Sequence, residues 1–170
     1  MQTSSVPNRP LQLASIFPRE ATIIGLNERS KPGVTAEMVR RLAQLGEFPA
    51  EREPAIVDIV LAREKAGSTA LGNGIAMPHC RTGYVKRLVG VVGIDQHGLT
   101  FDAVDGEPVY VIFLLLAPLE DRAQHFEVLG QISAIGKDKA LRMCLRGSRT
   151  PDDVQRLLED WNRNLSGFST

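Results

Sequence analysis

The chain has 170 residues, of which 43% are hydrophobic and 24% charged, a balance typical of one globular domain with a substantial core. Basic and acidic residues number 20 each, so the bulk charge favours neither a nucleic-acid partner nor a charged membrane surface. The longest apolar run, residues 109–117, is too short to span a bilayer, and the polar N-terminus has no secretory signal core. We therefore expect a cytoplasmic protein that neither binds nucleic acid nor inserts directly into a membrane.

The first half of the chain predicts a strand and two helices. Residues 1–10 are rich in Ser, Asn and Pro, and we expect a disordered lead there, followed by one domain over residues 11–165. Residues 21–26 read as a short strand. A turn at Lys31-Pro32-Gly33 precedes a helix that we expect Thr35 to cap.

The second helix is predicted over residues 52–66, with Arg63 near the end of its apolar stripe. Next, Gly72-Asn73-Gly74 marks a tight backbone path, and residues 75–79 are extended because the residue before a proline avoids the helical region. Three strands and two turns follow, with strands over 88–95, 100–101 and 109–116 and turns at 96–98 and 105–108.

Three helices close the chain. They are predicted over residues 121–135 and 139–145 and from Pro151 onward, the last one capped by Thr150. Helices and strands alternate, which predicts an α/β fold: a single-domain sandwich with a mixed β-sheet flanked by helices on both faces. The connections around residues 96 and 106 are too short for crossovers, so some strands must pair antiparallel.

Only three histidines occur, and two of them lie where chemistry is plausible. His79 follows the glycine-rich segment and a proline, while His125 begins an inward-facing helical stripe. His97 lies in a predicted turn, and we expect it to be solvated. A neutral imidazole near Arg63 could accept a phosphoryl group, because an arginine fork and backbone N–H groups can neutralise its oxygens.

In this scheme Gly72, Asn73 and Gly74 supply backbone donors and His125 a second hydrogen bond, with no metal or cofactor required. Each residue also has an ordinary explanation. His79 could be a loop histidine, and His125 a partly buried histidine of a helix. Arg63 could reach from an amphipathic helix to solvent, and the glycine-rich segment could be only a tight turn.

Three stretches resemble the enzyme IIA domains of the bacterial phosphotransferase system, of the nitrogen-regulatory or the fructose/mannitol type. The run from Arg63 to His79, REKAGSTALGNGIAMPH, is similar to the family signature R-E-x-x-x-S-T-G-[hydrophobic]-G-N-G-[hydrophobic]-A-[hydrophobic]-P-H. Residues 102–118 resemble the family's D-G-x-P-V segment and the strand that follows. His125 with the apolar residues after it resembles the family's H-L-x-x-L-x-x-[LI] helix. The similarity covers roughly residues 11–160.

The resemblance implies a phosphotransferase component in which His79 is the phosphoacceptor, on its tele nitrogen Nε2. Arg63 and His125 would be its active-site companions. The donor would be phosphorylated HPr or its nitrogen-branch counterpart, and the downstream partner a IIB domain or a regulatory target. Three residues depart from the pattern: Ala70 replaces a glycine, Phe126 a leucine, and Cys80 the small residue that usually follows the phosphoacceptor.

We expect a regulatory phosphocarrier of the nitrogen branch. One alternative is the IIA component of a fructose or mannitol permease, and another is an interaction module that is not phosphorylated. A metal-dependent hydrolase using His79, Cys80 and His125 is a weaker alternative, because these residues have no recognisable ligand spacing. Cys80 is expected to pack in the interior, since neighbouring residues of an extended segment point to opposite sides.

Overall fold

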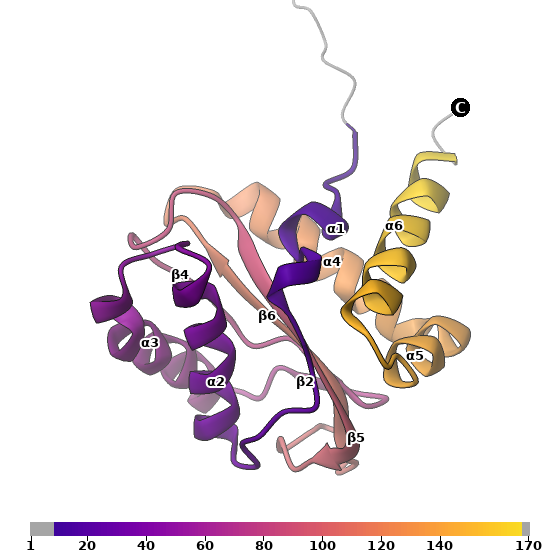
Figure 1. Ribbon diagram of the computed structural model, residues 1–170, viewed down its shortest axis with the longest axis horizontal. Coiled ribbons are helices and arrows are strands. Elements are labelled where there is room, and N and C mark those ends of the chain that lie inside the picture. The colour runs from indigo at the N-terminus through magenta and orange to yellow at the C-terminus, as the bar shows by residue number, and fades with distance from the viewer. Residues whose placement is uncertain (1–8, 168–170) are drawn as a thin grey trace, which may run out of the picture.

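Two layers of helices enclose a six-stranded sheet in the computed structural model, which describes residues 9–167 (Figure 1). The disordered lead expected over residues 1–10 therefore lies almost entirely outside the described residues. Within them, no helix is both long and apolar enough to cross a membrane. The α/β sandwich with a mixed sheet between helices is confirmed.

The predicted helices and the two long strands occur in the predicted order, while a short helix at Leu13–Ile16 and a strand at Ala70–Gly72 were not predicted. The helices are α1 (Leu13–Ile16), α2 (Lys31–Gln44), α3 (Glu53–Lys65), α4 (Arg122–Lys137), α5 (Lys139–Arg146) and α6 (Pro151–Gly167). The strands are β1 (Thr22–Ile24), β2 (Ala70–Gly72), β3 (Ile75–Ala76), β4 (His79–Arg81), β5 (Val89–Leu99) and β6 (Val109–Ala117). Short 3-10 turns over Arg19–Ala21 and Ala50–Arg52 precede β1 and α3.

The strand order is β1-β5-β6-β3-β2, and β4 also pairs with β6, further along that strand than β3. β5 and β6 are antiparallel, as their short connection requires, whereas β3 and β4 both run parallel to β6. Met77 and Pro78 thus divide the predicted extended segment 75–79 into two strands, and both strands pair with β6.

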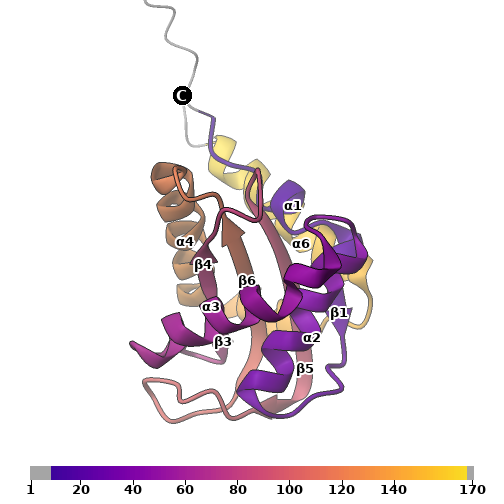
Figure 2. The same cartoon turned by 90° about the vertical axis from the view of Figure 1, so that its left-hand side faces the viewer.

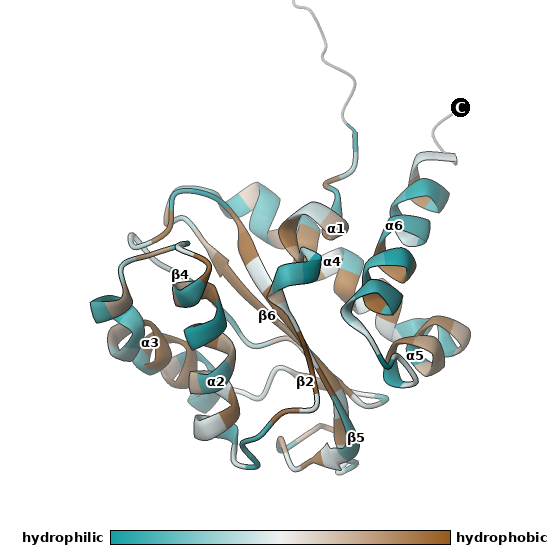
Figure 3. Cartoon of the chain, in the orientation of Figure 1, coloured by the Kyte–Doolittle hydropathy of each residue, from teal (hydrophilic) through white to brown (hydrophobic). Residues whose placement is uncertain are grey.

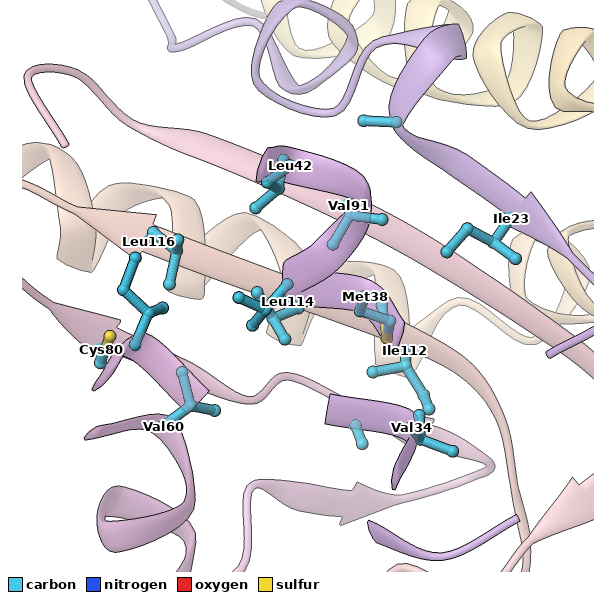
Figure 4. Packing of buried hydrophobic residues seen from close by; sticks show 14 of the residues in the cluster. Ile23, Val34, Met38, Leu42, Val60, Cys80, Val91, Ile112, Leu114 and Leu116 are labelled. Carbon is cyan, nitrogen blue, oxygen red and sulfur yellow. The ribbon is translucent and has the colours of Figure 1, made fainter. Parts of the chain in front are cut away.

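Strand β6 separates two hydrophobic cores, because its side chains alternate between the faces of the sheet. Ile112, Leu114 and Leu116 face α2 and α3, and Figure 4 shows this cluster with Cys80 and Met38 packed into it. Phe113 and Leu115 face α1, α4, α5 and α6. Figure 3 shows the consequence, since the central strands are largely hydrophobic, apart from the polar end of β5, while the helices expose hydrophilic surfaces.

The start of α2 differs from the prediction. The helix begins at Lys31 and not after a turn, because Pro32 fits the first helical turn, where no N–H needs a partner. Ser30 is its N-cap, and its Oγ accepts a hydrogen bond from the Gly33 N–H at 3.1 Å. Thr35 lies inside the helix and donates to the Lys31 carbonyl, so the prediction that Thr35 caps the helix is wrong.

The segment after residue 95 also differs. Residues 96–98 belong to β5, whose pairing with β6 is irregular there, and the Asp95 carboxylate accepts the N–H groups of His97 and Gly98. His97 is exposed, as predicted. The short strand expected at residues 100–101 is absent, because Phe101 fills the core beside α2 instead of pairing with a strand.

Candidate functional site

Two imidazoles meet between β4 and α4. The pairing of His79 with Leu115 on β6 directs its side chain to the α4 side of the sheet. His125 lies one turn into α4, on the same stripe as the buried Val128 and Ile132. The ring centroids are 5.1 Å apart with the planes at 67°, and each residue is only 7% exposed. Figure 2 shows α4 beside β4 and β6.

The hydrogen bonding of His79 identifies which ring nitrogen carries the proton. Its Nδ1 lies 2.7 Å from the carbonyl oxygen of Met77. Because a carbonyl can only accept a hydrogen bond, Nδ1 must carry the proton, and the lone pair is then on Nε2. The neutral ring therefore presents Nε2 as its nucleophile.

Both imidazoles are held neutral at physiological pH. Burial lowers the pKa of His79, the hydrogen bond to the Met77 carbonyl partly opposes this, and the nearby charge of Arg63 lowers the pKa further. Burial also lowers the pKa of His125 to about 4, with additional contributions from His79 and Arg81. The Nε2 of His125 is buried and has no hydrogen-bond partner among the described residues. A buried nitrogen of this kind is ready to bond an incoming polar group.

Arg63 is close enough to act on His79 electrostatically, but it does not lie on the buried stripe of α3. It is exposed, and its guanidinium donates to the Gly67 carbonyl at 2.9 Å. The buried line of α3 runs through Ile56, Val60 and Glu64. Each four-residue step advances about 40° around a helix, so this line turns toward Glu64 and leaves Arg63 facing solvent.

The glycine-rich segment forms a tight two-residue turn, as predicted. Gly72, Asn73 and Gly74 all have positive φ, and the Asn73 N–H donates to the Asp105 carboxylate at 2.9 Å. The neighbouring Ile75 pairs with Val111, four residues before the partner of His79 on β6.

That separation along β6 amounts to about 13 Å at 3.3 Å per residue. The structure therefore does not bring these three backbone N–H groups beside the imidazole. Ala70, the departure from the family glycine, is buried in β2 and is not among the residues with positive φ, so its methyl group causes no backbone strain.

Two residues near the site were missed by the sequence reasoning. Arg81 lies two residues after His79 on β4, so both side chains point to the same face, and its charge acts on His125. Its spacing from His79 on an extended segment was the available signal. Glu64 is buried at the end of α3. The glutamate of the family signature was the available signal, but a glutamate next to an arginine normally faces solvent, so no role was assigned to it.

Cys80 faces away from His79. It packs in the core beside α3, and burial raises the pKa of its thiol to about 12. The prediction that Cys80 packs in the interior is confirmed, and a site joining it to the two histidines has no geometric support. The part of the chain that the structure describes contains no group of three or more His, Cys, Asp or Glu residues that could hold a metal ion.

One protein family matches most of the chain. Residues 15–161 match the family described as "Phosphoenolpyruvate-dependent sugar phosphotransferase system, EIIA 2". The chain belongs to this family.

Its relatives include the nitrogen-regulatory class. A protein of Pseudomonas aeruginosa named "Nitrogen regulatory protein" is 34% identical over 152 residues, which cover 88% of this chain and 96% of the relative. The crystal structure of the nitrogen regulatory protein IIA-Ntr from Neisseria meningitidis has a TM-score of 0.79 at 30% identity, covering 86% of this chain and 98% of that one. The nitrogen-regulatory type is thus better supported than the fructose/mannitol type.

A more distant structure, a complex of enzyme IIA and phosphorylated enzyme IIB for mannitol from Escherichia coli, shares the fold. Its TM-score is 0.69 at 21% identity, and the match covers 83% of this chain and 95% of that one.

Proposed function

We propose that this protein is a regulatory phosphocarrier of the nitrogen branch that accepts a phosphoryl group on Nε2 of His79. The observation that carries the proposal is the hydrogen bond from Nδ1 of His79 to the Met77 carbonyl, beside a second neutral imidazole. A phosphoacceptor histidine needs an unprotonated nitrogen at neutral pH, and this bond selects Nε2 for that role.

In the transfer, the Nε2 lone pair of His79 forms a new P–N bond while the P–N bond to the donor histidine breaks. The electron pair of the broken bond returns to the donor nitrogen. The His79 ring gains positive charge as it bonds phosphorus, and the Met77 carbonyl that accepts from Nδ1 stabilises this charge.

The surrounding groups fit the negative charge of the phosphoryl oxygens. His125, neutral and with a buried unpartnered Nε2, can donate one hydrogen bond when that nitrogen carries the proton. Arg63 and Arg81 supply positive charge from the ends of α3 and β4. The distance of Gly72, Asn73 and Gly74 from His79 argues against direct hydrogen bonds from their N–H groups to a phosphoryl group on that ring.

Incubation with phosphoenolpyruvate, enzyme I and either HPr or its nitrogen-branch counterpart tests the proposal. We expect one acid-labile phosphate, measured by mass spectrometry, that disappears in His79→Ala and forms more slowly in His125→Ala. Failure to phosphorylate with either carrier would favour a module that signals by binding alone.

The branch assignment has a separate test. The mannitol IIA of Escherichia coli was solved in complex with phosphorylated IIB, so transfer to a IIB domain is the competing function. A regulatory phosphocarrier of the cytoplasm should retain its phosphate when mixed with IIB domains, while its affinity for a regulatory target should change on phosphorylation. Rapid transfer to a IIB domain that drives sugar uptake would contradict the regulatory assignment.

A further inference from the structure

Glu64 is a buried charge that the proposed transfer does not use. Its side chain is only 2% exposed, and the Lys31 ammonium, 18% exposed, lies 3.1 Å from its carboxylate. Lys31 also lies above the Phe101 ring and 3.3 Å from Asp102. A carboxylate taken out of water is costly unless it is paired and hydrogen-bonded, so the fold must hold Glu64 in one position.

The carboxylate in turn holds Thr69, the residue just before β2. The backbone N–H of Thr69 donates to Oε1 of Glu64 at 3.1 Å, and the Thr69 hydroxyl donates to the same oxygen. Thr69 is itself buried. The start of the β2–β3 hairpin is therefore fixed to the end of α3 by two hydrogen bonds from one residue.

Thr69 lies opposite Met77, whose backbone N–H donates to the Thr69 carbonyl at 3.1 Å. The carbonyl of Met77 then accepts from Nδ1 of His79 at 2.7 Å. Met77 and Pro78 lie between β3 and β4, outside both strands. The Met77 N–H ties this segment to the hairpin through Thr69, and the Leu115 N–H ties the Pro78 carbonyl to β6 at 3.0 Å. A continuous series of contacts runs from Lys31 through Glu64, Thr69 and Met77 to the imidazole.

We infer that Glu64 is a positioning residue for His79: by holding Thr69, it fixes the Met77 carbonyl that keeps the proton on Nδ1 and leaves Nε2 free. The role in phosphorylation rests on the proposed function, whereas the role in selecting the tautomer does not. Hydrogen-bond partners that hold an imidazole in one tautomer act in the same way at metal sites, where their loss costs roughly 10–100-fold in activity or affinity.

Two double variants separate the effect of losing the hydrogen-bond acceptor for Thr69 from the effect of losing the buried charge. Lys31→Met with Glu64→Gln removes both charges and keeps a carbonyl oxygen for Thr69, while Lys31→Met with Glu64→Leu removes both charges and the acceptor. Replacing both members of a buried ion pair is often tolerated, so both proteins should fold. Glu53→Gln breaks an exposed ion pair with Arg40 at the other end of α3 and serves as the control.

The readout is the tautomer of His79, measured from the ring ¹⁵N chemical shifts of the unphosphorylated protein at a pH where the imidazole is neutral. We expect the Nδ1–H form in the wild type, in Glu53→Gln and in the Gln double variant. We expect a substantial Nε2–H population in the Leu double variant, with phosphorylation slowed roughly tenfold or more.

An unchanged tautomer in a folded Leu double variant would overturn the inference, as would equal tautomer shifts in the Gln and Leu variants. If the Leu variant does not fold, Thr69→Val decides: it removes one of the two bonds to Glu64, and an unchanged tautomer there also counts against the inference. A wild type with the Nδ1–H form that no carrier phosphorylates would contradict the proposed function and leave the positioning role intact.

Discussion

At the scale of single residues, the site depends on two imidazoles that remain neutral although they lie together. Their ring centroids are 5.1 Å apart, and two positive rings at this distance would repel each other in a poorly hydrated space. Burial is the main reason that the pKa of each ring is lowered, so both rings keep a lone pair at neutral pH. Protonation of either ring therefore opposes folding.

This predicts a loss of stability in acid. His125 has a folded pKa of about 4 against an ordinary value of 6.5, so the unfolded chain binds more protons between these values. The free energy of unfolding should be highest above pH 6.5 and should fall as the pH drops toward 4, with His79 acting in the same direction. Urea denaturation across this range checks the prediction.

The matched variants are His125→Phe and His97→Phe. The first removes a buried titrating ring and should flatten part of the pH dependence, while the second removes an exposed ring of β5 and should leave the dependence in place. The same slope in His125→Phe and in the wild type would contradict this account.

At the scale of elements, the helices are positioned by their capped ends and by close packing against the sheet. The Ser30 hydroxyl satisfies the Gly33 N–H in the first turn of α2, the turn that also carries Lys31 toward Glu64. Ser30→Ala should lower the free energy of unfolding by about 1 kcal/mol, measured in urea. Ser30→Asp retains an acceptor oxygen and should cost much less, and equal losses in both variants would show that capping is not the cause.

A second prediction concerns two glycines in different elements. A Cβ on Gly90 of β5 would lie 2.2 Å from the ring of Phe17, which packs edge-on against Phe113. Gly90→Ala should therefore destabilise the protein by roughly 1–3 kcal/mol.

Gly130 provides the matched substitution. It is exposed in α4, and a Cβ there would have no atom within 4 Å. Gly130→Ala should stabilise the protein by up to about 1 kcal/mol, because alanine is the better helix former. Thermal denaturation of both variants checks the pair, and a stabilised Gly90→Ala protein would refute the packing argument.

At the scale of the whole molecule, exposed apolar side chains lie beside the buried imidazole pair. Phe126 is 68% exposed and stacks beside His125, and the exposed Leu71 lies on β2, which packs against α4. Exposed apolar groups next to a reactive site are typical of docking surfaces. The Asn73-Gly74 turn and Met143 line a different cavity, at the other end of β3.

Phe126→Asp should raise the KM for the phosphorylated carrier roughly tenfold, since it replaces an apolar contact by a charge that repels a phosphorylated donor. Its stability should be unchanged, because the side chain is exposed. Met143→Asp alters an equally exposed residue, 64% accessible, on α5 and should leave the KM unchanged. Equal effects of both substitutions on transfer would indicate that the carrier does not dock beside His125.

Local patterns in the chain determined much of this protein. Apolar spacing predicted helices α2 to α6 and the buried strand β6, and short connections required a mixed sheet. Extended backbone before and after Pro78 placed His79 and Cys80 on opposite sides, and the stripe that begins at His125 pointed it inward. These features depend on the period of a helix or strand, which neighbouring residues specify by themselves.

Tertiary structure alone decided how these parts meet. The register on β6 sets His79 apart from the Gly72-Asn73-Gly74 turn, and no local pattern encodes a register between strands that are distant in sequence. The packing of α3 buries Glu64 and leaves the adjacent Arg63 in solvent. Which of the two is buried depends on the elements that pack against the helix. The contact between His79 and His125 joins elements 46 residues apart, and only the folding of α4 onto the sheet brings them together.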